Sequence, residues 1–256
     1  MFVDTHCHLT DERYENIDSL CLDTLNNQVD FAICVGYDVP SSQKSLNVAE
    51  KYSQIYFTAG VHPDTANDYN QTVESQIENM AKHNKCVAIG EIGLDYHYDG
   101  FIKQNQINAF ESQIKLANKL NLPISVHSRD STLDTLTIIK GNKNLLSNVG
   151  VLHCFSGSKE VAKEYLDLDF YLSFGGTLTY KNSLTAKEVC KYAPIDRILT
   201  ETDCPYLTPQ IFRGQINYPK YVRYVVEEIA KLKEIEVNIV AKQVKQNAKN
   251  LFTKIK

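Results

Sequence analysis

The chain has 256 residues, of which 43% are hydrophobic and 23% are charged. This balance is ordinary for a globular protein with a sizeable core and excludes a largely disordered chain. The 31 acidic residues outnumber the 27 basic ones, for a formal net charge of -4. No basic field therefore covers the whole molecule, and a nucleic-acid partner would have to be held in a local groove. The length fits two small domains or one large α/β barrel.

Short apolar segments alternate with longer amphipathic segments along the chain. Rich in Val, Ile, Ala and Phe, the apolar segments predict eight strands, at Phe2 to His8, Phe31 to Gly36, Tyr56 to Val61, Val87 to Gly93, Ile124 to His127, Val149 to Cys154, Phe170 to Phe174 and Ile198 to Thr202. Between strands, spacings such as Phe110, Ile114, Ala117 and Leu120 indicate one apolar face of a helix. Strands that are apolar on both faces are typical of a parallel sheet covered by helices. Eight such units predict a closed (β/α)8 barrel, the TIM barrel, rather than an open sheet.

The last segment predicts an additional C-terminal helix. Its apolar positions, Val240, Val244, Ala248 and Phe252, recur at helical spacing beside Lys242, Lys245, Lys249 and Lys254. We interpret the lysines as the solvated face of this helix, with a nucleic-acid tail as the alternative. No low-complexity linker, hinge or charge run marks a boundary, so residues 1–256 are expected to form a single domain.

The seven cysteines form no short-spacing pair, which disfavours a thiolate zinc site. Cys7, Cys154 and Cys204 stand beside candidate metal ligands, and strand alternation predicts that they face the other way, as small buried packing groups. Free cysteines are typical of a reducing compartment. The first strand begins at Phe2 and no apolar run is long enough to cross a bilayer, so we expect the protein in the cytoplasm, without a membrane partner.

Potential metal ligands gather where the predicted strands end. They are His6, His8, His62, Glu91, His127, His153 and Asp203, and they include five of the seven histidines. His83 and His97 are the other two, and both are expected at the surface. Because the functional groups of such barrels lie at the carboxyl ends of the strands, these side chains should converge on one rim.

The donor set predicts a site for two divalent ions. Imidazoles and carboxylates without thiolates suit Zn, Mn or Mg, and His6, His8, Glu91, His127, His153 and Asp203 offer more donors than one tetrahedral ion needs. Glu91 is the expected bridge, because a carboxylate has two oxygens and Gly90 and Gly93 allow close approach. The alternative, a buried acid paired with a base, finds no cation in the adjoining sequence.

Asp203 and Glu201 are two positions apart and are expected to face the same way on the last strand. We assign Asp203 to a metal and to general-base catalysis, with Glu91 as the other catalytic group; Glu201 would orient a ligand. Arg129, two residues after His127, is expected to hold an anionic part of a substrate, with a salt bridge to Asp130 or another acid as the alternative. His62 is assigned to the substrate, with metal binding left open.

The chain resembles the TatD family of metal-dependent deoxyribonucleases, within the metallo-dependent hydrolase superfamily. The matching stretches run from end to end and are Asp4 to Leu9, Gly60 to Pro63, Gly90 to Tyr96, His127 to Arg129, His153 to Gly157, Glu201 to Leu207 and Asn247 to Phe252. Glu91 stands where many amidohydrolase relatives use a lysine bridge, which favours the TatD branch. The stretch from Arg213 to Pro219 keeps Arg, Gly, Asn and Pro but varies between them, which affects the inferred substrate preference.

The resemblance implies a (β/α)8 hydrolase that binds divalent metals and cleaves phosphodiester bonds of DNA ends or single strands. By position it implies that His6, His8, Glu91, His127, His153 and Asp203 are the metal ligands. An alternative keeps the site but attacks a carbonyl ester or amide, for example an aminoacyl ester. A third reading, a scaffold without catalysis, would predict missing donors, whereas this set is complete. Aromatic residues expected near the mouth could stack on bases, though packing explains most of them equally well: Tyr96, Tyr98, Phe155, Tyr206 and Phe212.

Overall fold

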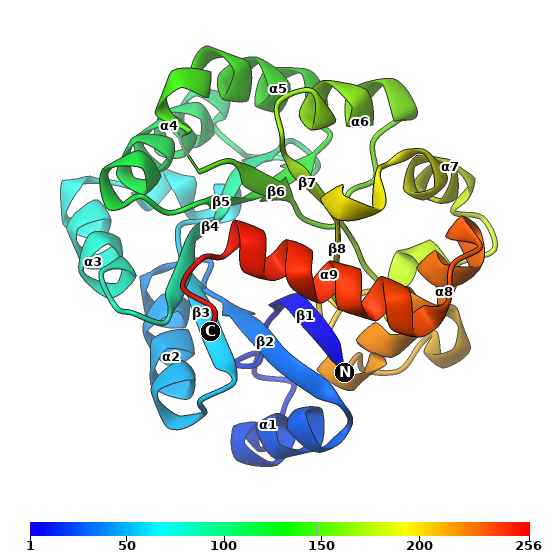
Figure 1. Ribbon diagram of the computed structural model, residues 1–256. Coiled ribbons are helices and arrows are strands. Elements are labelled where there is room, and N and C mark those ends of the chain that lie inside the picture. Colours follow the sequence, from blue (N-terminus) through cyan, green and yellow to red (C-terminus); the bar gives the residue numbers. More distant parts are fainter. Residues whose placement is uncertain (147) are drawn as a thin grey trace.

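The computed structural model describes residues 1–146 and 148–256. Within these residues, eight parallel strands form one sheet in the order β1 to β8, so each strand pairs with the next along the chain. They are β1 (Phe2–Cys7), β2 (Val29–Val35), β3 (Ile55–Ala59), β4 (Cys86–Asp95), β5 (Ile124–Arg129), β6 (Gly150–Leu152), β7 (Tyr171–Phe174) and β8 (Ile198–Thr200). Helices surround the strands, as Figure 1 shows. The predicted (β/α)8 barrel is confirmed.

One helix follows each strand on the outside of the barrel. These helices are α1 (Ile17–Asn26), α2 (Val39–Lys51), α3 (Gln71–Ala81), α4 (Lys103–Leu120), α5 (Thr132–Gly141), α6 (Lys159–Leu166), α7 (Leu184–Tyr192) and α8 (Val222–Lys233). As the sequence predicts, α4 buries Phe110, Ile114 and Ala117, because apolar residues three and four apart share a helical face. Packing of this kind holds α4 against β4.

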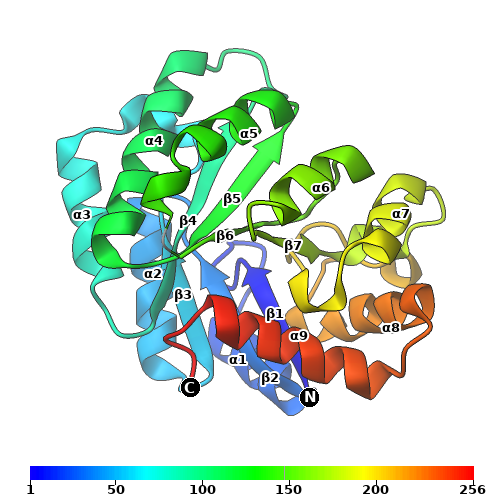
Figure 2. The same cartoon turned by 45° about the horizontal axis from the view of Figure 1, so that its top comes forward.

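A further helix, α9 (Val237–Leu251), crosses the end of the barrel at which the strands begin (Figures 1 and 2). Its buried Asn247 donates hydrogen bonds from Nδ2 to the carbonyl oxygens of Ile195 and Ile198, both at 2.8 Å. Val240 and Val244 are buried on the same helix. The additional C-terminal helix is therefore confirmed, and it covers the end opposite to the predicted site.

Hydrogen bonds join β1 to β8 and to the segment after it, so the barrel is nearly closed. Thr5 Oγ1 donates to the Thr200 carbonyl and Thr200 Oγ1 to the Val3 carbonyl, each at 3.0 Å. Beyond β8, the Asp203 amide donates to the His6 carbonyl at 2.9 Å. The first and last candidate ligands in the sequence are thus neighbours in space.

Several strands end at other residues than predicted. β4 continues to Asp95 and β5 to Arg129, whereas β6 stops at Leu152 and β8 at Thr200. The short strands end because the backbone turns left-handed soon after them, with φ of 45° at Cys154 and 53° at Asp203. Across the described residues, none of the helices combines the length and the apolarity needed to span a lipid bilayer.

The cysteines are all free, and six of the seven are buried. Cys7 and Cys204 are fully buried, as predicted. The prediction for Cys154 is wrong, since this residue is only partly buried. Its left-handed backbone breaks the strand alternation on which the prediction rested.

Candidate metal centre

The predicted donors converge at the carboxyl end of the barrel. His6 lies in β1 and His8 directly follows it; Glu91 lies within β4 and His127 within β5. His62, His153 and Asp203 follow β3, β6 and β8 in connecting segments. The group is almost enclosed, because the side chains of His6 and Glu91 are only 1% and 5% exposed. The structure therefore brings together donors that are far apart in the sequence.

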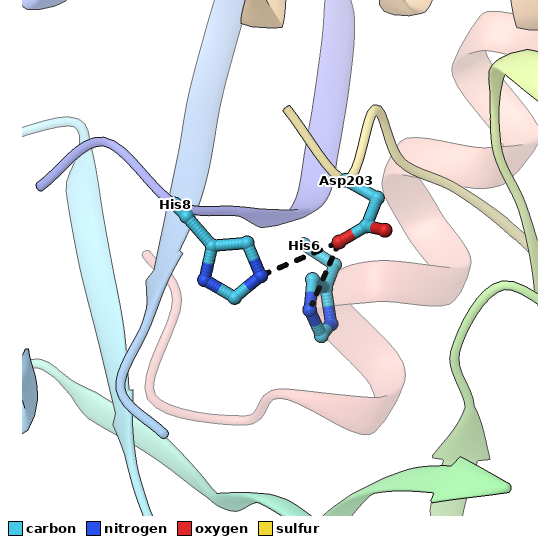
Figure 3. A group of neighbouring side chains, drawn as sticks. All are labelled: His6, His8 and Asp203. Atoms are coloured by element: carbon cyan, nitrogen blue, oxygen red, sulfur yellow. Dashed lines mark ion pairs between the residues drawn. The ribbon is translucent and has the colours of Figure 1, made fainter. Parts of the chain in front are cut away.

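One oxygen of Glu91 faces a first set of donors. Glu91 Oε2 lies 3.4 Å from His6 Nε2 and 4.0 Å from His8 Nε2. Asp203 Oδ1 lies 3.7 Å from His6 Nε2 and 3.3 Å from His8 Nε2. Figure 3 shows His6, His8 and Asp203 directed toward one another. These three residues have the spacing of a group that could hold a metal ion.

The other oxygen of Glu91 faces a second set. Glu91 Oε1 lies 2.8 Å from His153 Nε2 and 3.0 Å from His127 Nδ1. The two imidazole nitrogens are 3.1 Å apart. Glu91, His127 and His153 again have the spacing of a metal-binding group. Glu91 thus stands between two sets of donors, one on each carboxylate oxygen.

The first set has spacings and unpartnered atoms that fit a divalent ion. Bonds of 2.0 to 2.1 Å in a tetrahedral site place ligand atoms about 3.3 to 3.4 Å apart. The 3.4 Å and 3.3 Å separations of His6 from Glu91 and of His8 from Asp203 match this value. His6 Nε2 is buried and has no hydrogen-bond partner among the described residues. A cation among these atoms would satisfy that nitrogen.

The charge state of the cluster also suits a cation. Burial alone would raise the pKa of Glu91, but its electrostatic interactions with the neighbouring imidazoles of His153, His6 and His62 hold it well below its usual range. Burial likewise opposes ionisation of Asp203, yet the hydrogen bond with His8 lowers its pKa. Burial lowers the pKa of His6, which favours the neutral imidazole that a metal requires. The cluster therefore offers ionised oxygens beside the neutral His6. Against the effect of burial, neighbouring carboxylates raise the pKa of His8, His127 and His153, so a metal that binds these three imidazoles must displace their protons.

Asp95 is a site residue that the sequence analysis did not assign. Its Oδ2 lies 3.0 Å from His127 Nε2, and a carboxylate there holds the proton on Nε2 and leaves Nδ1 free to face Glu91 and His153. Gln106 fixes the Asp95 backbone by accepting from its amide at 3.0 Å. The sequence did contain an indication of this role. Asp95 follows Gly93 by two residues, so extending the predicted strand from Val87 beyond Gly93 would have placed Asp95 on the same face and at the same rim.

His62 also lies beside Glu91, but its two ring nitrogens have different partners from those of the other histidines. Its Nε2 lies 3.7 Å from Glu91 Oε1, and its Nδ1 accepts a hydrogen bond from the Asp64 amide at 3.2 Å. In a neutral imidazole with Nδ1 as acceptor, Nε2 carries the proton and has no lone pair for a metal. This tautomer favours a hydrogen bond to a substrate. The opposite tautomer would donate from Nδ1 to Asp64 Oδ2, which lies 3.4 Å away, and His62, Asp95 and His127 have the spacing of a metal-binding group, so both roles stay open for His62.

Arg129 lies at the rim without a salt bridge. Its Nη1 contacts the Tyr98 hydroxyl at 3.3 Å, and the guanidinium lies 5.1 Å from the centre of that ring. Among the described residues, no carboxylate lies within 4.0 Å of it, and Asp130 contacts His97 Nδ1 at 2.8 Å instead. The alternative of a salt bridge with Asp130 is therefore wrong. His97 is exposed, as predicted, and His83 is partly buried.

Glu201 and Asp203 both reach the centre, although neither lies in β8. Glu201 Oε1 accepts from the Cys154 amide at 2.5 Å and lies 3.6 Å from His153 Nδ1. Asp4 anchors the connecting segment, because its carboxylate accepts from the amide and the hydroxyl of Thr202. The prediction that both acids lie on the last strand is therefore wrong, because β8 ends at Thr200; this anchored turn, rather than strand alternation, brings them to the centre.

These features define a class of protein: a (β/α)8 barrel with a buried histidine and carboxylate cluster at the carboxyl end of its strands. A family model described as TatD related DNase matches residues 3–253. The chain belongs to the TatD family.

Relatives of this family cover almost the whole chain. The "uncharacterized metal-dependent hydrolase YabD" of Bacillus subtilis is 44% identical over 253 residues, which are 98% of this chain and 99% of the relative. The "3'-5' ssDNA/RNA exonuclease TatD" of Klebsiella pneumoniae is 32% identical over 225 residues, 86% of this chain and 85% of the relative. The crystal structure of YJJV, a TatD homologue from Escherichia coli, superimposes with a TM-score of 0.93, with 28% identity and 98% of each chain covered.

Proposed function

We propose that this chain, a metal-dependent hydrolase of the TatD family, is a deoxyribonuclease that hydrolyses phosphodiester bonds in DNA. The observation that carries the proposal is the position of Glu91, whose two oxygens face separate donor sets at 3.4 Å and 2.8 Å. Such a bridge is typical of sites with two metals that act on phosphate esters. The exonuclease name of the Klebsiella relative supports a nucleic-acid substrate.

Two divalent ions, of zinc, magnesium or manganese, are the proposed cofactors. His6, His8 and Asp203 would hold one, His127 and His153 the other, and Glu91 would bind both. When bound, such ions neutralise phosphate oxygens and lower the pKa of water. Asp95 keeps His127 in the required tautomer by holding Nε2 at 3.0 Å.

Asp203 is the proposed general base. It stays ionised because the contacts with His8 and His6 lower its pKa against the effect of burial. Its side chain is 13% exposed, more than the 5% of Glu91, so it is the acid nearer the mouth. An ionised carboxylate at this place accepts a proton from the attacking water and delivers it to solvent.

His62 and Arg129 are the proposed substrate contacts. The protonated Nε2 of His62 donates toward a phosphate oxygen, and the unpaired guanidinium of Arg129 offers two parallel N–H groups to a second one. The ring of Tyr98 below Arg129 limits the directions in which it points. We further propose that the chain works as one domain and acts in the cytoplasm, which its free cysteines favour.

Hydrolysis of end-labelled single-stranded DNA, with and without a chelator, tests the proposal. We expect cleavage that stops with the chelator and returns with zinc, magnesium or manganese, and the fragment lengths separate cleavage from an end from internal cleavage. An aminoacyl ester and a simple amide are assayed in parallel, because a metal site can also serve carbonyl centres. Hydrolysis of either without cleavage of DNA would contradict the proposal and favour the alternative substrate.

A further inference from the structure

A buried asparagine contacts both ends of the turn that carries Asp203. Asn217 is fully buried, and its Nδ2 donates to the Thr202 carbonyl at 2.8 Å and to the Tyr206 carbonyl at 2.6 Å. Its backbone amide donates to the Pro205 carbonyl at 3.2 Å. One residue thus binds the whole segment from Thr202 to Tyr206, which we name the Asp203 turn.

The backbone around the Asp203 turn is unusual for its residue types. Asp203 has a left-handed φ of 53°, and Leu207, directly after the turn, has a φ of 50°. Residues with a side chain keep this conformation where the surrounding contacts hold it. The conformation matters because it directs the Asp203 carboxylate into the metal centre, where Oδ1 lies 3.3 Å from His8 Nε2 (Figure 3).

The main-chain hydrogen bonds between this turn and the β1 segment hold only its first half. They join Asp203 and Cys204 to β1 and to the residue that follows it. In the second half, the carbonyls of Pro205 and Tyr206 accept hydrogen bonds only from Asn217, among the residues that the structure describes. These carbonyl groups are therefore held in place by Asn217.

Asn217 is itself fastened to the segment that carries His8. Its carbonyl accepts from the Tyr14 hydroxyl at 2.6 Å, and the Tyr14 amide donates to the Asp11 carbonyl at 3.1 Å. The Asp11 amide donates to the His8 carbonyl at 3.2 Å. A chain of hydrogen bonds therefore runs from His8 to Asn217, so His8 and Asp203 are fixed relative to the same buried residue.

We propose that Asn217 is a positioning residue for Asp203. Its side-chain amide keeps the turn in the conformation that places the carboxylate beside His8, and in this way it completes the first donor set. The inference rests on the proposed function, in which Asp203 binds a metal and serves as the base. It adds a role in the metal centre for the stretch from Arg213 to Pro219, which the sequence analysis connected only with substrate preference.

Site-resolved metal binding by Asn217→Ala tests this role. The full-length variant is freed of metal with a chelator and titrated with manganese, and crystals at limiting manganese give the occupancy of each site from its anomalous peak. Loss of a partner outside the ligand shell costs roughly 10- to 100-fold in metal affinity. We expect a loss of this size at the site that Asp203 completes, and no comparable change at the site of His127 and His153.

Asn247→Ala is the matched control. Asn247 is also fully buried, its Nδ2 also donates to two carbonyls, and its Oδ1 accepts from Gln243 Nε2 at 2.8 Å. The Oδ1 of Asn217 accepts in the same way from the Tyr218 amide, at 2.9 Å. Both variants should therefore lose thermal stability to a similar extent. Because Asn247 lies at the far end of the barrel, its loss should leave both metal sites unchanged.

Tyr14→Phe is a milder second variant. It removes only the hydroxyl that donates to the Asn217 carbonyl, so we expect a smaller loss of affinity at the same site. Tyr165→Phe is its control, because the Tyr165 hydroxyl is buried and has no hydrogen-bond partner among the described residues. If Asn217→Ala does not fold, an unchanged affinity in Tyr14→Phe would overturn the role.

The outcomes separate this inference from the proposed function. A loss confined to the Asp203 site supports the positioning role even if no DNA is cleaved, in which case only the proposed chemistry fails. Equal losses at both sites, no loss, or the same loss in Asn247→Ala would overturn the role even if DNA is cleaved.

A crystal structure of metal-free Asn217→Ala gives the same test without any ion. We expect Asp203 Oδ1 to move away from its place 3.3 Å from His8 Nε2. A carboxylate that kept its place would overturn the positioning role, whatever the metal titration showed.

Discussion

Glu91 is the residue on which the two donor sets depend, because each of its oxygens faces one set. Replacing it with glutamine keeps its size but removes the charge and one acceptor oxygen. We expect Glu91→Gln to lower metal affinity by more than the roughly 10- to 100-fold that loss of an outer partner costs, and to abolish hydrolysis. Metal content by plasma mass spectrometry, measured beside the rate of DNA cleavage, checks both effects. A variant that kept full activity would contradict the bridging role.

Asp95 affects the metal through His127 rather than by contact. Asp95→Asn removes the carboxylate that holds His127 Nε2 at 3.0 Å, so we expect metal affinity to fall about 10- to 100-fold while the fold persists. Metal titration by calorimetry measures the change. Asp130→Asn is the control, because Asp130 lies nearby but contacts the exposed His97. Equal losses in both variants would show that Asp95 has no special role.

At the residue scale, the sequence predicted which donors meet but not how each is oriented. His6 and His8 share a face through strand alternation, which is a local pattern and can therefore be predicted from the sequence. The tautomer of His62 depends on a hydrogen bond from Asp64, and Arg129 is free because Asp130 contacts His97. Such contacts depend on loop conformation, which periodicity does not encode.

The pairing of β4 with β5 places Glu91, Asp95 and His127 together. Gly93 pairs with His127, and the glycine has φ of 144°. A Cβ at this position would lie 2.0 Å from the His127 carbonyl oxygen. The two strands can therefore approach this closely only because residue 93 has no side chain.

Gly93→Ala should destabilise the protein by about 3 kcal/mol or more, because it adds a backbone clash to an unfavourable φ. Urea unfolding measures the loss. Gly141→Ala in α5 is the matched control, since nothing lies within 4 Å of its Cβ position, and it should be neutral or stabilising by up to about 1 kcal/mol. Stability unchanged by Gly93→Ala would contradict the close pairing of the two strands.

At the scale of elements, all eight strands were predictable because short apolar runs alternate with longer amphipathic helical segments along the chain. The ends of the strands were harder to predict. Asp95 was missed because β4 extends two residues beyond Gly93, where the composition turns polar although pairing with β5 continues. The left-handed backbone at Cys154 and Asp203 was not predictable, because neither position carries the glycine that usually indicates this conformation.

The whole molecule separates stability at one end from chemistry at the other. Helix α9 covers the end where the strands begin, and Asn247 holds it there through the carbonyls of Ile195 and Ile198. Asn247→Ala removes both hydrogen bonds, although the Ile195 carbonyl still accepts from the Ile198 amide, and the loss should cost about 1 to 3 kcal/mol of unfolding free energy. Because the metal centre lies at the far end, kcat of the folded variant should not change.

Asn250→Ala provides the comparison on the same helix. Asn250 is exposed and contacts Gln246, so its loss should change stability by no more than about 0.5 kcal/mol. Chemical unfolding and steady-state kinetics on the two variants separate the effects. A large fall in kcat for Asn247→Ala, at unchanged stability, would contradict the separation of the two ends.

The most direct measurement is anomalous X-ray diffraction from crystals of the protein loaded with manganese or zinc. We predict two anomalous peaks joined by the two oxygens of Glu91, one also contacted by His6, His8 and Asp203 and the other by His127 and His153. A single peak that does not touch Glu91, or none within reach of these side chains at saturating metal, would contradict the proposed site.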